Sequence, residues 1–213
     1  MVKQQLKHLE GMKTNKISII GASGHAKVII DIAEILGYYI DKVFDQDENK
    51  LNILNFSVCH SFNDIPKESV IAIGNNQIRK VIATSCYLES PILIHPFSNV
   101  SKYSEIGTGT VVMSGVSINA GTSIGKHCII NTNSSIDHDC VINDFVHVSP
   151  NASLAGNVFI GEGTHIGIGA CIIQGVKIGK NCVIGAGAVV IRDVLDGIIV
   201  VGNPAKELKK IKN

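Results

Sequence analysis

Several hallmarks of common protein classes are absent from these 213 residues. No apolar run approaches the roughly 18 to 20 residues of a membrane span, and the N-terminus lacks the apolar region of a signal peptide, so we expect a cytoplasmic protein without a membrane span. The formal net charge is only +1, which offers no general attraction to nucleic acid, and we expect no nucleic-acid partner. The six cysteines include no CxxC pair, which argues against a cysteine zinc site, and we expect no metal.

One strict repeat occupies the second half of the chain. From residue 94 to residue 190 an aliphatic residue falls on every sixth position. A period of six is neither the 3.6 of a helix nor simple alternation, and it indicates a solenoid of short strands. Three hexads would close a triangular coil of about 18 residues, so the run predicts about five to six stacked coils around a buried aliphatic core.

Glycine or asparagine often follows the repeat aliphatic directly. We interpret this position as a corner where φ is positive or space is crowded. The pattern occurs at Gly107, Gly125, Gly161, Gly167, Gly179 and Gly185, and with asparagine at Asn119, Asn131 and Asn143. Cys128, Cys140 and Cys182 each lie two places before a repeat aliphatic, so we expect them to be small, reduced core residues.

The first part of the chain alternates strand-like and helix-like segments. A β-prone run over 16–20 leads into a glycine turn and a helix, and two further strand-like runs end in polar residues. This order predicts a small parallel Rossmann-like sheet with its loops gathered at the carboxyl edge, where a ligand would bind. The candidate substrate-binding residues at that edge are Gly21, Ser23, Gly24, His25, Lys27, Asp45, Gly74 and Asn75.

The ligand of this edge is not specified by one motif. The turn glycines are spaced GxxG, and the GxGxxG of a dinucleotide fold is missing, so NAD is not favoured. The plainer alternative is that the glycines merely close a strand–helix turn. Convergence of Asp45 and Gly74 on the same edge favours a nucleotide smaller than NAD. His25 and Lys27 could each contact a phosphate or lie on the solvated helix face.

Pro91 and Pro96 separate the two patterns, because proline fits poorly in a continuing helix or central strand. We therefore divide the chain into a flexible lead over 1–15, a Rossmann-like domain over 16–90, a β-helix over 91–195, and a C-terminal loop and tail over 196–213.

The most polar stretch of the repeat surrounds His138. Asp137 and Asp139 flank this histidine, and a carboxylate can orient an imidazole and make it more basic, as general-base catalysis requires. The alternative is a surface histidine between solvated acids. His147 and His165 are one predicted coil apart, so we expect them to stack on the same edge of the solenoid.

The order of these motifs resembles the sialic acid O-acetyltransferase and nucleotide-aminosugar N-acetyltransferase family, which includes bacillosamine-type and perosamine-type N-acetyltransferases. The motifs are GASGHAK near the start, Asn131-Thr132, Asp137-His138-Asp139-Cys140, Phe145-Val146-His147-Val148-Ser149, Ala155-Gly156 and Gly202-Asn203-Pro204-Ala205-Lys206. The resemblance implies a left-handed parallel β-helix, a homotrimer with sites in the clefts between neighbouring helices, and acetyl-CoA as co-substrate.

The resemblance also implies roles for individual residues. His138 would be the general base and Asp139 would orient it, although close relatives often have Glu there. Asn131 and Asp137 would contact the sugar nucleotide. The implied acetyl-CoA-binding residues are His147, Gly156, His165, Ile168, Gly187, Gly202, Pro204 and Lys206. The implied reaction is direct transfer of acetyl to the 4-amino group of a nucleotide-linked amino-dideoxy sugar, in surface-glycan biosynthesis.

Three other functions stay open. The acceptor could be a sialic acid hydroxyl, or the chain could be a non-catalytic partner of a sialic acid synthase. A metal-dependent hydratase like the γ-class carbonic anhydrases would need three convergent histidines, and that family's ligand spacing is not matched here. Cys140 is expected to point into the core, which argues against a cysteine nucleophile.

Overall fold

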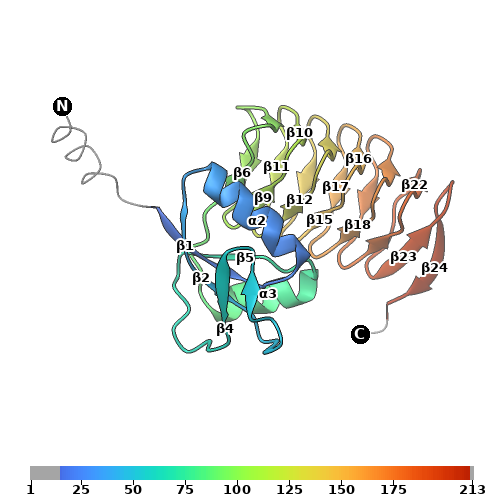
Figure 1. Cartoon of the computed structure of the whole chain (residues 1–213). Coiled ribbons are helices and arrows are strands. Elements are labelled where there is room, and N and C mark those ends of the chain that lie inside the picture. The colour runs from blue at the N-terminus through green and yellow to red at the C-terminus, as the bar shows by residue number, and fades with distance from the viewer. Residues whose placement is uncertain (1–14, 212–213) are drawn as a thin grey trace, which may run out of the picture.

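The computed structural model describes residues 15–211 and has two parts that lie side by side (Figure 1). A small α/β domain comes first, and a long three-sided β-helix follows it. The predicted lead over 1–15 lies outside the described residues except for Asn15. None of the helices in the described part of the chain is long and apolar enough to cross a membrane.

The N-terminal sheet has the strand order β3-β4-β2-β1-β5. Strands β2, β1 and β5 are parallel, and one helix follows β1 while another follows β5, as the alternating pattern predicts. A short hairpin, β3 and β4, was not predicted and extends the sheet beside β2. The elements are β1 (Lys16–Ile20), α2 (Gly24–Ile35), β2 (Tyr39–Phe44), β3 (Asn52–Ile53), β4 (Phe56–Cys59), β5 (Ser69–Ile71) and α3 (Asn76–Ser85).

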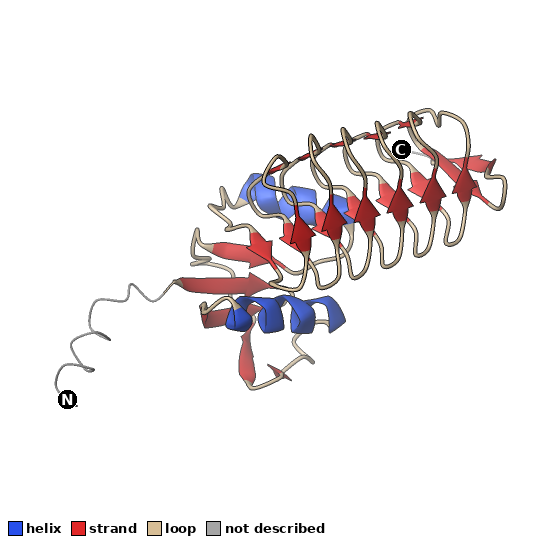
Figure 2. Cartoon of the chain, turned by 90° about the horizontal axis from the view of Figure 1, so that it is seen from above, coloured by secondary structure: helices blue, strands red, loops and turns tan. Residues whose placement is uncertain are grey.

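The β-helix has three faces, and each face is a sheet of parallel strands apart from β24. Figure 2 shows the stacked coils from above. Face 1 consists of β6 (Leu93–Ile94), β9 (Val111–Val112), β12 (Ile129–Ile130), β15 (His147–Val148), β18 (His165–Ile166), β21 (Val183–Ile184), β23 (Ile198–Val201) and the antiparallel β24 (Lys206–Lys210). Face 2 consists of β7 (Asn99–Val100), β10 (Ser117–Ile118), β13 (Ser135–Ile136), β16 (Ser153–Leu154), β19 (Cys171–Ile172) and β22 (Val189–Val190). Face 3 consists of β8 (Glu105–Ile106), β11 (Ser123–Ile124), β14 (Val141–Ile142), β17 (Phe159–Ile160) and β20 (Lys177–Ile178).

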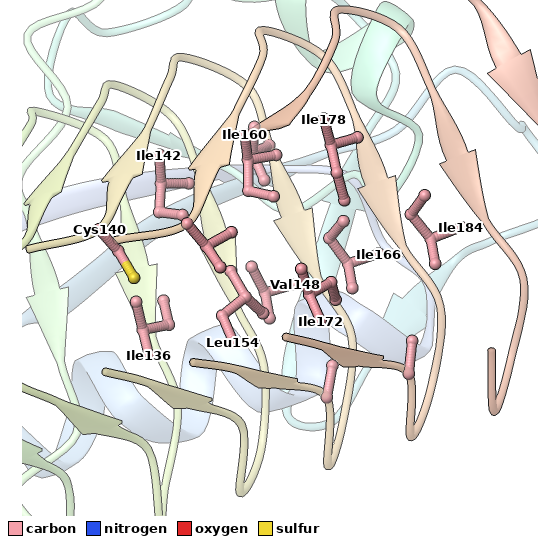
Figure 3. Close-up of a cluster of buried hydrophobic side chains, with 14 of the residues drawn as sticks. Ile136, Cys140, Ile142, Val148, Leu154, Ile160, Ile166, Ile172, Ile178 and Ile184 are labelled. Atoms are coloured by element: carbon pink, nitrogen blue, oxygen red, sulfur yellow. The ribbon is translucent and has the colours of Figure 1, made fainter. Parts of the chain in front are cut away.

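The repeat aliphatics fill the interior of this prism (Figure 3). Register pairs such as Ile118 with Ile136 are one coil apart, so the same position of each coil stacks on the next. Stacking buries a continuous core that no single coil could bury alone. Cys128, Cys140 and Cys182 are free and fully buried among these side chains, as predicted.

The corners differ from the prediction in one respect. Positive φ occurs at the third position after the repeat aliphatic, as at Gly109 (φ 72°) and Asp139 (φ 57°), and not at the first. The first position is instead crowded by the next coil: a Cβ added to Gly107 would lie 2.6 Å from the carbonyl carbon of Gly125. Crowding by the next coil therefore explains the glycine directly after the repeat aliphatic, and the predicted positive φ at that position is wrong.

The N-terminal domain covers face 1. Apolar residues of α2 share one buried cluster with Leu93, Val111, Met113 and Ile129 of the first coils. Polar residues of α3 dock on the corner between face 3 and face 1. In a triangular prism the corner between faces 2 and 3 lies opposite face 1, so that corner is the one farthest from the N-terminal domain.

Candidate functional site

His138 lies on the corner between faces 2 and 3, directly after β13. Its Nδ1 is 2.8 Å from Oδ2 of Asp139, and its backbone N–H donates to Oδ1 of Asp137 at 2.8 Å. The positive φ of Asp139, which aspartate tolerates, is part of the same corner turn. The hydrogen bond to Asp139 and the charge of Asp137 raise the pKa of His138 above its ordinary value. An imidazole whose Nδ1 is engaged in this way presents Nε2 to solvent as a proton acceptor.

Gly156 lies one coil beyond His138 and packs against its ring. A Cβ at Gly156 would lie 2.6 Å from Cε1 and Nε2 of His138, so only glycine leaves room for the imidazole. Within the described residues the Gly156 N–H donates no hydrogen bond. The carboxylate of Asp137 is held from the other side by Nδ2 of Asn119 at 2.7 Å, a contact that the sequence analysis missed.

A second histidine group lies on face 1. His147 and His165 are register partners, as predicted. Their rings pack edge to face, with 4.8 Å between the ring centroids. Nδ2 of Asn131 is 3.1 Å from Nε2 of His147, and the Ser149 hydroxyl is 3.3 Å from Nε2 of His165.

This group is neutral at neutral pH. Burial, His165 and Arg79 lower the pKa of His147 to about 3, and burial with Arg79 lowers the pKa of His165. His25, at the start of α2, also lowers the pKa of His147, and burial followed by Arg79 lowers the pKa of His25 to about 4. Neutral imidazoles orient polar ligands by hydrogen bonds and have little capacity to take up a proton at this pH.

A pocket of about 750 Å³ opens at the carboxyl edge of the N-terminal sheet. Gly21, Ser23, Asp45 and Gly74 line it, as the predicted edge requires, together with the apolar side of α3. Gly21 has φ +113°, and a Cβ there would lie 2.8 Å from the Ala72 carbonyl oxygen, so this turn needs glycine.

Asp45 is firmly held at this pocket. It accepts hydrogen bonds from the Ala22 and Asp47 amides and from Nζ of Lys50. Burial alone would raise its pKa, but these hydrogen bonds hold the pKa below the ordinary value, so the group is a carboxylate at neutral pH. An ionised carboxylate can accept a hydrogen bond from a ribose hydroxyl, and a lysine beside it can pair with a phosphate.

Four of the substrate residues predicted at this edge do not line the pocket, namely His25, described above, and Asn75, Lys27 and Gly24. Asn75 is the N-cap of α3 and its side chain accepts a hydrogen bond from the Ile78 amide, so it has a structural task. Lys27 is exposed on α2, and Gly24 is an exposed first residue of that helix.

Of the predicted acetyl-CoA residues, His147 and His165 lie on face 1, Gly156 lies beside His138, and Ile168 and Gly187 lie on the corner between faces 1 and 2. Ile168 and Gly187 stack there in successive coils, where the Gly187 amide donates to the Ile168 carbonyl at 2.8 Å. Gly202 and Pro204 belong to the turn between β23 and β24, and Lys206 begins β24 with its side chain exposed.

The structure thus separates the predicted residues into two groups. The nucleotide-sized pocket, Asn131 and His147 lie on the side of face 1, whereas His138, Asp139 and Gly156 lie on the opposite corner of the same chain. One chain by itself does not bring the two groups together. Within residues 15–211 no three His, Cys, Asp or Glu side chains converge as a metal site would need.

Comparison with known proteins places both parts of the chain. Residues 16–86 match the PglD N-terminal domain, and residues 157–192 match the bacterial transferase hexapeptide repeat. The acetyltransferase domain of PglB from Neisseria gonorrhoeae FA1090 is 39% identical with a TM-score of 0.87, over 91% of this chain and 100% of that chain. The same domain has also been solved in complex with acetyl coenzyme A.

Two further solved structures are similar over nearly the whole length. PerB from Caulobacter crescentus, in complex with CoA and GDP-perosamine, is 35% identical with a TM-score of 0.86, over 91% of this chain and 97% of that chain. WeeI from Acinetobacter baumannii AYE is 28% identical with a TM-score of 0.81, over 90% of this chain and 99% of that chain. The chain therefore belongs to the family of sialic acid O-acetyltransferases and nucleotide-aminosugar N-acetyltransferases, acetyl-CoA-dependent enzymes with a Rossmann-like N-terminal domain and a left-handed hexapeptide-repeat β-helix.

Proposed function

We propose that this chain transfers the acetyl group of acetyl-CoA to the 4-amino group of a nucleotide-linked amino-dideoxy sugar, in surface-glycan biosynthesis. The observation that carries the proposal is the corner at His138, where one carboxylate holds Nδ1 and Gly156, whose amide donates no hydrogen bond within residues 15–211, packs against the ring. Because acetyl-CoA and nucleotide sugars are cytoplasmic metabolites, we assign the reaction to the cytoplasm.

The proposed transfer is direct. Nε2 of His138 takes a proton from the sugar nitrogen as that nitrogen attacks the thioester carbonyl, and Asp139 stabilises the imidazolium that forms. The oxyanion accepts a hydrogen bond from the Gly156 amide. When the carbonyl re-forms, the carbon–sulfur bond breaks and the CoA thiolate leaves, taking up the proton held by His138, which regenerates the neutral imidazole. The proposed reaction has no acyl-enzyme intermediate. Cys140 is not suited to be a nucleophile, because it is fully buried and burial raises the pKa of its thiol.

The two substrates would bind on different elements. We assign the nucleotide to the pocket at the carboxyl edge of the N-terminal sheet, with Asp45 at the ribose and Gly21 and Ser23 at the diphosphate. Asn131 and His147 would orient the sugar and acetyl groups through neutral hydrogen bonds. The CoA chain would run along Ile168, Gly187, Gly202 and Pro204 toward Lys206, which would pair with a phosphate.

We further propose a homotrimer whose sites are completed between copies. Since His138 lies on the corner opposite face 1, we expect a sugar held by the N-terminal domain of one copy to meet the His138 of a neighbouring copy. The prism has an exposed face 2 with small residues at Ser117, Ser135 and Ser153, which allows a second β-helix to approach closely.

The test is thiol release from acetyl-CoA with UDP-, dTDP- and GDP-linked 4-amino-4,6-dideoxy sugars, with free and activated sialic acid as parallel acceptors. Release with a 4-amino sugar, and N-acetylation in the product by mass spectrometry, supports the proposal. Turnover on sialic acid alone would reassign the acceptor to a hydroxyl. Absence of release with every acceptor would remove the enzymatic proposal.

A further inference from the structure

Arg79 is the largest fully buried side chain of the described residues and has no part in the mechanism above. It lies on α3 at 1% exposure, between the N-terminal domain and the β-helix. Burial lowers its pKa to about 10, so it remains a cation at neutral pH. A buried cation without a carboxylate partner is costly unless all its donors are satisfied, so its contacts indicate what it does.

The guanidinium is satisfied by oxygen atoms from both domains. Nη1 donates to the carbonyls of Ile73 at 3.0 Å and Gly74 at 3.2 Å, in the loop between β5 and α3. Nε donates to the carbonyl of His127 at 2.8 Å, and Nη2 donates to the carbonyl of Phe145 at 2.9 Å, on the corner between faces 3 and 1. Nη2 also donates to Oδ1 of Asn76 at 2.8 Å. These contacts use the whole donor capacity of a guanidinium, which has about five N–H groups.

The two pairs of carbonyls belong to different structural features. Gly74 lines the nucleotide-sized pocket. His127 and Phe145 have positive φ values of 51° and 59°, at a position where most other corners of the β-helix have glycine, asparagine or aspartate. Their rings stack with 5.6 Å between the ring centroids. Bulky residues hold this conformation only where the surroundings support it, and Arg79 is part of that support.

Weaker contacts continue the same docking surface. Nδ2 of Asn76 donates to the Gly163 carbonyl at 2.9 Å, and Lys80 pairs with Glu162. The Lys80 side chain is 43% exposed, so its ion pair is screened by solvent, unlike the contacts of Arg79.

We infer that Arg79 is a positioning residue, which sets the place of the nucleotide pocket relative to the β-helix so that the bound sugar reaches the acetyl site. The inference rests on the proposed function, and it assigns to α3 the role of aligning the two substrates. Its physical basis is that the fork of a guanidinium fixes both direction and distance to several carbonyls at once, which an ammonium cannot do. A displacement of about 1 Å in a bound substrate can lower a rate about 100-fold.

The test compares Arg79→Lys and Arg79→Met with Lys80→Ala, a control on the same helix that removes an exposed contact to the same corner. We expect kcat/KM for the sugar nucleotide to fall about tenfold or more in both Arg79 variants. The pocket walls belong to the N-terminal domain itself, so Kd for the matching nucleoside diphosphate, measured by calorimetry, should change by less than about threefold. KM for acetyl-CoA should also change by less than about threefold. Lys80→Ala should stay within about twofold of the parent on all three measures.

A merely structural role gives a different pattern. If the substitutions only reduce the amount of folded protein, kcat per total protein and the number of calorimetric binding sites fall together, and both KM values stay unchanged. That result would overturn the inference. An unchanged kcat/KM in a folded Arg79→Lys variant would overturn it as well. A readout independent of turnover is hydrogen exchange: we expect faster exchange in peptides covering 73–79 and 127–145, with β1 and β2 unchanged. If the unaltered protein releases no thiol, the proposed function fails, but hydrogen exchange still tests whether Arg79 holds the N-terminal domain against the β-helix.

Discussion

Histidines in two regions of this β-helix have opposite electrostatic surroundings. His138 is about half exposed between two carboxylates, and its pKa is raised. His147 is mostly covered by the N-terminal domain, near Arg79 and His25, and its pKa is lowered to about 3. The same side chain is therefore prepared to accept a proton on one corner and to remain a neutral hydrogen-bonding group on the opposite side. The surroundings of each residue, and not its type, decide which task it can perform.

The largest expected effect is that of His138→Ala. Removal of the proposed base should lower kcat by about 100- to 10,000-fold, with acetyl-CoA binding retained. The measurement is thiol release in steady state, with calorimetry for acetyl-CoA. Cys140→Ala is the matched control, two residues away but inside the core, and should keep kcat within about twofold. A large loss in the cysteine variant with little loss in the histidine variant would reverse the assignment.

Gly156→Ala should act on the same ring from the neighbouring coil. The new methyl group would lie 2.6 Å from the imidazole, so the ring must turn away from its hydrogen bond with Asp139. We expect kcat to fall about 10- to 100-fold, and circular dichroism should report an intact β-helix because the backbone of Gly156 does not need positive φ. Normal activity in this variant would show that the position of His138 tolerates change.

Asp139→Asn sharpens the electrostatic side of the comparison. Catalysis requires neutral His138, so kcat/KM should rise with pH through the raised pKa of the free enzyme. The substitution removes the charge at Nδ1, so the pKa should fall and the acidic limb should move to lower pH, while the maximum rate falls on the order of tenfold. The measurement is a pH–rate profile of both proteins. An acidic limb at the same pH in both would assign the titration to another group.

The smallest expected effect concerns stability at acid pH. His147 has a lowered pKa in the folded protein and an ordinary value near 6.5 when unfolded, so the unfolded chain binds the proton first. Stability should therefore fall as pH drops below 6.5 toward 3, by about 2 kcal/mol between pH 7 and pH 5. His147→Gln cannot titrate and should lose correspondingly less over this interval, measured by urea unfolding at both pH values. Parallel losses in the two proteins would mean that His147 is not the source.

Local patterns were sufficient to predict most of the architecture. The six-residue period predicted the β-helix, its coil size and the stacking of His147 on His165, because each of these depends on positions one coil apart in the sequence. The glycine turn and the strand order likewise predicted the N-terminal sheet and the pocket residues Gly21, Asp45 and Gly74. The hairpin of β3 and β4 escaped prediction because its strands are too short for a clear alternation.

Contacts between distant segments could not be predicted in the same way. Asn119 is one coil before Asp137, so the phase of the repeat contained a usable signal for that contact. Arg79 had no such signal, because its partners His127 and Phe145 belong to another domain and offer only backbone carbonyls, which every residue has. Asn75 was expected at the ligand but is occupied as a helix cap.

By itself, the sequence determined that a triangular coil must form, since only burial of every sixth side chain removes this aliphatic surface from water. It also determined that His138 has a carboxylate within reach, because Asp139 is its chain neighbour. Only the tertiary structure decided that the nucleotide pocket and His138 lie on opposite sides of one chain. The physical reason is that docking of α2 and α3 on face 1 depends on shape and buried hydrogen bonds between segments that are far apart in the sequence.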